Sequence, residues 1–431
     1  MEQTMAIPNQ TSPMKKVLGI RDFVLLWIGQ GTSMLGDQFH SIAGAWLVLQ
    51  MTGDPLALGM VMALSGIPRA IFTVIGGAIT DRISPRKIML ISDFVRLFVS
   101  ALMAMQIFTS TLQVWMIYVY AVVEGIMGGL FGPASMSIVP YVVPKEDLQA
   151  GNSLSQGTSS LIGFVGPAIA GAMIAVFHNE IMGMAAAISI DALTFFVSVV
   201  TLWLMLPEKA EIITNDEPKS SNIIASVKEG FGYMFKDPVL RMMFIMIALA
   251  NLCFTGPLLV GIPFLAEIRF TGGPAAYGII MSGYAGGDLL GIILSGVLPK
   301  LNKKMVRVFL IVMFASFGLG IIAMGWISAT WLATADLFVL GILNGYLSIL
   351  LITGLQRSTP KALMGRLMSM ILLANMSMMP ISQALSGVAL RWSVISVFMA
   401  SGFILISLSV AMAFSPTVGK LGDTLLGDPL N

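Results

Sequence analysis

The stretch GGAITDRISPRK, residues Gly76 to Lys87, joins two long apolar segments early in the chain. Its adjacent glycines allow helices to approach closely. Asp81 can accept hydrogen bonds or meet a helix N-terminus, where negative charge is favoured. The basic residues at its end hold such a loop on one side of a membrane. Taken by itself, the stretch is an ordinary basic loop between two spans, and whether it has a further function has to be judged from the rest of the chain.

The composition of the chain matches a protein whose solvent is a lipid bilayer. Of its 431 residues, 56% are hydrophobic and only 11% are charged, whereas about 25% are charged in a typical soluble domain. A spanning helix takes about 20 apolar residues, so the chain has room for roughly twelve spans with their connections. The net charge of +2 is spread over short loops without a continuous basic face, which argues against nucleic acid as a partner.

Apolar segments bounded by charges, Gly and Pro recur along the chain and predict an all-α membrane protein. The only long polar stretch, residues 207–237, falls near the midpoint and divides the segments six plus six. The pattern at 77–87 has a faint counterpart at 296–304, which indicates two six-helix pseudo-repeats. We expect twelve spans, at about 23–49, 57–79, 88–108, 114–139, 153–177, 182–206, 240–266, 276–298, 305–327, 331–355, 367–390 and 393–414.

This division predicts a first half at residues 1–206, a cytoplasmic linker at 207–238, a second half at 239–414 and a cytoplasmic tail at 415–431. Lys and Arg give the orientation, because cytoplasmic loops carry an excess of them. With both termini inside, twenty of the 24 basic residues are cytoplasmic, Arg269 and Arg391 are outside, and Arg69 and Arg96 lie within spans. Residues 1–19 lack an apolar core with a cleavage site, so we expect the first span to be retained.

The opening stretch, with Asp93 and Arg96 after it, resembles the signature loop of the major facilitator superfamily, G-x-x-x-D-R-x-x-x-R-K. The resemblance implies twelve helices around a central cavity and secondary transport by alternating access, without enzymatic activity or a cofactor. In this family the loop is viewed as a latch that holds one conformation and breaks on switching. On that resemblance, the latch residues are Gly77, Asp81, Arg82, Arg86, Lys87, Asp93 and Arg96, the last two bracing the loop.

A second pattern lies in the fifth predicted span, where Gly163, Gly166, Pro167 and Gly171 place small residues at one-turn spacing beside a kinking proline. Helix packing alone accounts for such a face. The pattern also resembles the antiporter motif of the superfamily's fifth helix, which is tied to drug efflux, although Ala170 stands where a second glycine is usual.

Further stretches resemble the branch that contains macrolide efflux proteins and the enterobactin exporter, and lysophospholipid transporters share much of the pattern. These stretches are SMLGDQ at Ser33–Gln38, PYVVPKEDL at Pro140–Leu148, and Gly365-Arg366.

Ionisable residues inside predicted spans are costly and are functional candidates by default. Asp37, Arg69 and Glu124 fall near one depth. An arginine between two carboxylates would offset their burial and could release one of them for protonation. In the fold that the resemblance implies, the first and fourth helices line the cavity, so Asp37 and Glu124 are candidate proton or cation sites. The alternative is a fixed structural ion pair. His40 either joins a relay or is simply hydrogen-bonded.

The second half offers Asp288, in mid-span and without a basic residue nearby in sequence. It is either a second proton site or the partner of a group on another helix. We interpret Asp191 as structural. Proton-driven relatives often carry an arginine where this chain has Ala121, which leaves Arg69 to take that role.

We therefore expect a secondary transporter in the inner or plasma membrane, monomeric, with both termini in the cytoplasm. Proton-coupled efflux of a lipophilic drug, antibiotic or siderophore-like molecule is favoured, with lipid translocation and proton-symport uptake as alternatives. A single cysteine, Cys253, and the lack of HExxH, GxSxG and phosphate-loop motifs argue against a metal centre or an enzyme.

Overall fold

The computed structural model describes residues 12–80, 83–206, 238–299, 301–358, 376 and 378–425. Within these residues the chain is helical and contains no strand. The first half supplies α1 (Pro13–Leu18), α2 (Arg21–Thr52), α3 (Pro55–Thr80), α4 (Pro85–Phe108), α5 (Val114–Val142), a short 3-10 turn (Lys145–Asp147), α6 (Leu148–Val176) and α7 (Glu180–Leu204).

The second half begins with a long helix in three parts: α9 (Pro238–Gly256), a π-helical turn (Pro257–Gly261) and α10 (Ile262–Ile268). It continues with α11 (Gly273–Val297), α12 (Lys303–Met324), α13 (Thr330–Ser358), the apolar helix Met378–Leu390, α15 (Val394–Phe414) and α16 (Pro416–Leu425).

The twelve predicted spans each overlap a described helix, and the predicted fold class is confirmed. Ten helices in the described part are long and apolar enough to cross a membrane. The first span, α2, has 32 residues and is long enough, but polar residues such as Asp37, Gln38 and His40 lower its hydropathy. The eleventh span is described only over its apolar part, Met378–Leu390.

Local sequence signals explain where several helices begin and end. Proline opens α3, α4 and α9, at positions where its missing N–H costs no helical hydrogen bond. Side chains cap other helices: Asn179 accepts from Ile181 N–H at 3.0 Å, and Asn302 accepts from Met305 N–H at 2.9 Å. Gly53 ends α2 with φ of 61°, a left-handed conformation that favours glycine.

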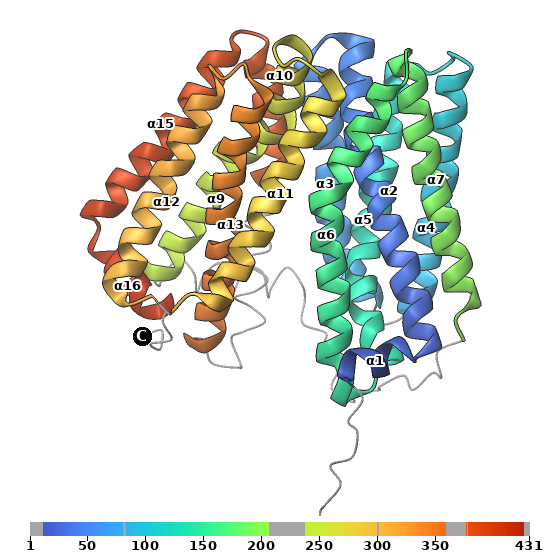
Figure 1. Ribbon diagram of the computed structural model, residues 1–431, viewed down its shortest axis with the longest axis horizontal. Coiled ribbons are helices and arrows are strands. Elements are labelled where there is room, and N and C mark those ends of the chain that lie inside the picture. Colours follow the sequence, from blue (N-terminus) through green and yellow to red (C-terminus); the bar gives the residue numbers. More distant parts are fainter. Residues whose placement is uncertain are drawn as a thin grey trace, which may run out of the picture.

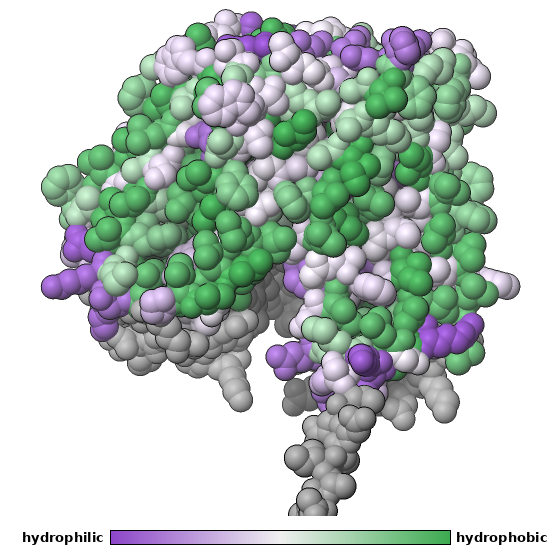
Figure 2. Space-filling model, in the orientation of Figure 1, coloured by the Kyte–Doolittle hydropathy of each residue, from purple (hydrophilic) through white to green (hydrophobic). Residues whose placement is uncertain are grey.

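The helices gather in two bundles, α2–α7 and α9–α15, with α1 and α16 at the same end of the molecule (Figure 1). Apolar side chains cover the flanks of both bundles, and hydrophilic residues gather toward the two ends (Figure 2). This distribution fits a protein surrounded by lipid tails along its flanks. The predicted linker lies mostly in 207–237, outside the described residues, so the proposed domain boundaries stay predictions.

The bundles meet at the end opposite α1 and α16. Two pairs of helices form this contact: α6 packs on α11, and α3 packs on the helix Met378–Leu390. A Cβ added to Gly59 would lie 2.6 Å from the carbonyl oxygen of Gln383, and one added to Gly387 would lie 2.9 Å from that of Pro55. Backbones this close leave room for glycine only. Toward the end that carries α1 and α16, a notch separates the two bundles (Figure 2).

Candidate functional site

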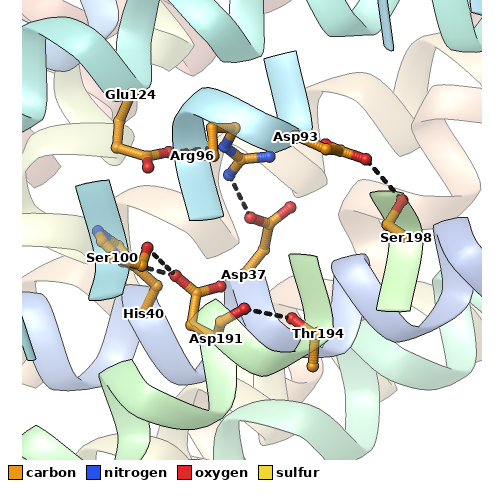
Figure 3. A network of polar contacts seen from close by, with 9 residues as sticks. All are labelled: Asp37, His40, Asp93, Arg96, Ser100, Glu124, Asp191, Thr194 and Ser198. Atoms are coloured by element: carbon orange, nitrogen blue, oxygen red, sulfur yellow. Dashed lines mark hydrogen bonds and ion pairs between the residues drawn. The ribbon is translucent and has the colours of Figure 1, made fainter. Parts of the chain in front are cut away.

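A cluster of ionisable side chains lies inside the first bundle, where four helices contribute to it (Figure 3). Asp37 and His40 come from α2, Asp93 and Arg96 from α4, Glu124 from α5 and Asp191 from α7. Hydrogen bonds link these side chains to one another and to serines on α4 and α7 (Figure 3). Charged groups at this depth persist only when they are paired or serve a function.

Arg96 joins the two carboxylates that the sequence analysis singled out. Its Nε donates to Glu124 Oε2 at 2.8 Å, and its Nη2 donates to Asp37 Oδ1. Its Cζ also lies 4.1 Å from the centroid of the Phe195 ring, in a cation–π contact. The planar guanidinium can serve two carboxylates and an aromatic face at once, which a lysine ammonium cannot do with fixed geometry.

The two carboxylates bound to Arg96 differ in exposure. The Asp37 side chain is 41% exposed, whereas that of Glu124 is 8% exposed. Glu124 Oε1 is buried and has no hydrogen-bond partner among the described residues. One positive charge therefore faces two carboxylates, one open to solvent and one enclosed, and a single bound proton would balance the trio.

Arg69 does not take the bridging position that the sequence analysis gave it. Its guanidinium packs against α5, where a Cβ added to Gly128 would lie 2.9 Å from Arg69 Nη2. It is exposed and makes no ion pair within the described part of the chain, although its charge acts electrostatically on Asp37 and Glu124. The arginine that lies between Asp37 and Glu124 is Arg96 and not the expected Arg69.

A second group of contacts surrounds Asp191, whose side chain is 1% exposed. Its Oδ2 accepts from Ser100 Oγ at 2.7 Å and contacts His40 Nδ1 at 3.0 Å. Asp93, also buried, accepts from Ser198 Oγ at 2.5 Å through Oδ2. Asp191, expected to be structural, and His40, for which a relay or a simple hydrogen bond is expected, form one pair beside Arg96 (Figure 3).

The latch residues of the sequence analysis differ in their surroundings. Asp81 and Arg82 lie outside the described residues. Gly77 has no atom within 4 Å of an added Cβ, and Lys87 is exposed. Arg86 donates to the carbonyl oxygens of Leu202 and Trp203 at 2.7 and 2.8 Å.

Arg86 thus caps the C-terminal end of α7, where cations are favoured. Asp93 and Arg96 lie in the buried cluster, so the expectation that they brace the loop is wrong for Arg96, whose donors reach Asp37 and Glu124 instead.

Of the glycines expected to form an antiporter motif, Gly171 lies at the contact between the bundles, next to Pro167 of the same motif. A Cβ added to Gly171 would lie 2.3 Å from the carbonyl oxygen of Pro274, and one added to Gly278 would lie 2.2 Å from that of Pro167. Gly166 instead faces Gln38 on α2, and Gly163 has nothing within 4 Å. Part of this motif therefore lets α6 and α11 touch backbone to backbone.

Asp288 is paired with a group on another helix, which was one of the two alternatives. Asn344 Nδ2 on α13 donates to Asp288 Oδ1 on α11 at 2.7 Å. The pair belongs to the second bundle and is separate from the cluster around Arg96. Within the described residues, no group of three or more His, Cys, Asp or Glu is arranged to hold a metal ion.

Sequence reasoning missed an ion pair between the bundles. Asp54, in the short connection from α2 to α3, accepts from Arg391 Nε at 2.8 Å through Oδ1, and Arg391 Nη2 donates to Oδ2. The two residues are 337 positions apart. In the sequence each of them is simply a charged residue in a loop, and Arg391 is one of the two basic residues expected on the outside.

Comparisons with known proteins agree with this architecture. The model of the family described as "Major Facilitator Superfamily" matches residues 26–383 of this chain. Macrolide efflux protein A of Streptococcus pyogenes is 23% identical over 401 residues, covering 93% of this chain and 97% of its own. The multidrug efflux pump Tap of Mycolicibacterium fortuitum is 23% identical over 399 residues, covering 90% and 94%.

Solved structures give the same fold at low sequence identity. The nucleoside transporter NupG superposes with a TM-score of 0.69 at 13% identity, covering 91% of this chain and 98% of its own. A D-xylose-proton symporter gives 0.70 at 14% identity, covering 92% and 98%. With a family match over most of its length and this fold, the chain belongs to the Major Facilitator Superfamily of transporters.

Proposed function

We propose that this transporter exports a lipophilic small molecule in exchange for protons. The observation that carries the proposal is the Arg96 bridge, in which one guanidinium holds a partly exposed carboxylate, Asp37, and a buried one, Glu124. Such a trio has room for one additional proton. The names of relatives along nearly the whole chain, a macrolide efflux protein and a multidrug efflux pump, support export.

The arrangement of the bundles supports a state open at one end. The bundles are joined by the Asp54–Arg391 pair and the glycine contacts, and the notch lies at the opposite end. The excess of Lys and Arg predicts that α1 and α16 face the cytoplasm. The notch is then the cytoplasmic entrance, through which a substrate would reach Asp37.

Competition between proton and substrate at Asp37 would couple their movements. With Asp37 charged, a substrate that carries a positive charge or hydrogen-bond donors can bind it. With Asp37 protonated, Arg96 pairs with Glu124 alone and the substrate loses its partner. A ligand shifts an equilibrium between two conformations only by its differential affinity for them, so this exchange would couple binding to the inward-to-outward transition.

Everted membrane vesicles with an acidic interior test the proposal. A fluorescent pH reporter follows the gradient while a macrolide, a cationic dye, a catecholate siderophore and lysophospholipid are added in turn. Substrate-dependent loss of the gradient, absent from vesicles without the protein, supports proton antiport. If a substrate moves only with the gradient reversed, the protein works by uptake and the proposed direction fails.

Two variants test the residues. Asp37→Asn and Glu124→Gln should each reduce substrate-dependent proton movement, whereas Glu146→Gln, which neutralises an exposed carboxylate outside the spans, should not. If both cluster variants retain the transport rate and its pH dependence, the proposed coupling residues are wrong.

A further inference from the structure

The cluster in the first bundle contains more carboxylates than the Arg96 bridge can balance. Four carboxylic acids lie in it: Asp37, Asp93, Glu124 and Asp191. Arg96 binds two of them, and its Nε and Nη2 do not reach the others. Because an enclosed charge without compensation costs several kcal/mol, the carboxyls away from Arg96 need another source of positive charge or a proton.

The hydrogen bonds of Asp191 indicate its protonation state. Its Oδ2 receives the Ser100 hydroxyl at 2.7 Å and lies 3.0 Å from His40 Nδ1. An ionised carboxylate accepts hydrogen bonds at both oxygens, whereas a protonated one also donates through its hydroxyl and needs an acceptor for it. Asp191 Oδ1 is buried and has no partner among the described residues. A hydroxyl at Oδ1 would have no acceptor there, so the contacts fit an ionised Asp191 that accepts from Ser100 and from a protonated His40 Nδ1.

His40 is the group in direct contact that can supply the balancing charge. The other charged groups that act on it are Glu124 and Arg96, and Arg96 already serves two carboxylates. Asp37 lies three residues before it on α2, α3 contributes only Arg69 as a charged residue, and α6 contributes none. Because the Asp191 side chain is only 1% exposed, its negative charge needs a cation in contact with it, which the imidazolium form of His40 provides.

The position of the His40 ring allows a proton to enter and leave. Its side chain is 26% exposed, while its partner Asp191 is enclosed. Nδ1 faces Asp191, and the other edge of the ring, with Nε2, points along α2 toward Gly44, where an added Cβ would lie 4.0 Å away. Asp37, the exposed member of the Arg96 bridge, lies about one helical turn before it on the same helix.

We propose that His40 and Asp191 form a second proton-binding site of this transporter, distinct from the Asp37–Arg96–Glu124 bridge, and that the proton is held on the His40 imidazole. Loss of that proton leaves Asp191 uncompensated, so the pair exchanges one proton with the solvent-accessible side as a unit. The inference deepens the proposed proton coupling and rests on it for its role in transport, but the site itself can be tested without transport.

Histidine NMR tests the site directly, because the chain contains only two histidines, His40 and the exposed His178. The full-length protein is labelled with 15N-histidine in lipid nanodiscs, and His40→Gln assigns the signals. At a pH of about 8, where an ordinary imidazole is neutral, His40 should show the spectrum of an imidazolium. Asp191→Asn should convert His40 to the neutral form while leaving His178 unchanged.

The result that overturns the site is a neutral His40 in the wild type at that pH, or an imidazolium that persists in Asp191→Asn. Since Asp191→Asn can also disturb folding, Ser100→Ala provides a milder comparison: it removes one hydrogen bond to Asp191 but keeps the charge, so His40 should remain an imidazolium. A neutral His40 in Ser100→Ala would show that the serine, and not the charge of Asp191, sets its state.

Transport measurements then separate this inference from the proposed function. His40→Gln should keep substrate binding and shift the pH profile of proton exchange. If the vesicles show no proton exchange but the NMR result holds, the proposed function fails and the site stands. If the vesicles show proton exchange with the same pH profile in wild type and His40→Gln, the transport role of the site fails while the proposed function stands.

Discussion

Arg391 binds Asp54 through two nitrogens, Nε at 2.8 Å from Oδ1 and Nη2 bonded to Oδ2, and so ties the two bundles together across 337 positions of sequence. The pair lies beside the Gly59–Gly387 contact, at the end opposite the notch. Opening that end requires the pair to separate. It therefore belongs to the state of the transporter that the structure shows.

Neutralising this pair should favour separation of the bundles at its end. Spin labels at Thr111 and Trp331, exposed residues of opposite bundles at that end, report the separation in a Cys253→Ala background. Asp54→Asn should populate longer distances than the parent protein. The charge-swapped double variant Asp54→Arg/Arg391→Asp should restore the short distance, and longer distances in the swap as well would show that the effect is not electrostatic.

The pH dependence of the same distance follows from Asp54. Its hydrogen bond from Arg391 holds the pKa of Asp54 below the ordinary value of 3.8. A carboxyl with a lowered pKa contributes stability above its ordinary pKa and loses it only as the pH falls through the lowered value. We expect the pair to be unchanged by pH at about 5 and above, so any opening with a midpoint near neutral pH would contradict this account of the closed end.

The contact between α6 and α11 should not tolerate side chains. Gly278→Ala would place a Cβ 2.2 Å from the carbonyl oxygen of Pro167, which forces the bundles apart or strains the helices. Overpacking of this kind costs about 1–3 kcal/mol. Thermal unfolding in detergent and the Thr111–Trp331 distance should both change. Gly163→Ala is the matched control, because nothing lies within 4 Å of its added Cβ, and an equal effect there would refute the contact-based explanation.

Removing Arg96 should cost more than removing Arg69. Arg96→Gln leaves Asp37 and the buried Glu124 without their guanidinium, and loss of one partner of a buried ion pair costs about 3–5 kcal/mol. Arg69→Gln removes an exposed group that forms no ion pair in the described part of the chain, so its effect on thermal stability should be small. In the Arg96→Gln/Glu124→Gln double variant, stability should partly return. A double variant no more stable than Arg96→Gln would contradict the bridge.

Arg86 should act on stability through α7 and not through the other bundle. Its two hydrogen bonds to the carbonyl oxygens of Leu202 and Trp203 place a cation at the end of a helix, an interaction worth about 0.3–1 kcal/mol. Arg86→Gln should lower the melting temperature slightly, while Lys87→Gln, at an exposed position, should leave it unchanged. Equal melting temperatures for the two variants would rule out this capping role.

The sequence predicts the helices well because apolar length alone decides which segments can cross a bilayer. Each predicted span overlaps a described helix. Even α2, whose polar residues lower its hydropathy, is recognised by its length and by the charges at its ends, Arg21 and Asp22 at one and Asp54 at the other. Depth in the membrane follows from the same count of residues, which is why the sequence alone places Asp37 and Glu124 near one level.

The partner of those carboxylates could not be predicted, because depth does not fix the direction in which a side chain points. Arg69 and Arg96 both lie within spans, and only the packing of α4 against α5 turns Arg96 toward Glu124. The nearness of Arg96 to Asp93 in sequence favoured its assignment to the loop motif. The contacts of His40 with Asp191 and of Asp54 with Arg391 depend on helices that are far apart in sequence, and no local pattern marks them.

Substrate-dependent proton movement in everted vesicles is the measurement that tests the central claim most directly, comparing the wild type with Asp37→Asn and Glu124→Gln at matched protein levels. We expect that at least one added compound dissipates the acidic-inside gradient in the wild type and that both variants lose or strongly reduce this response. Transport of the same compound without proton movement, or with full proton movement in both variants, would contradict it.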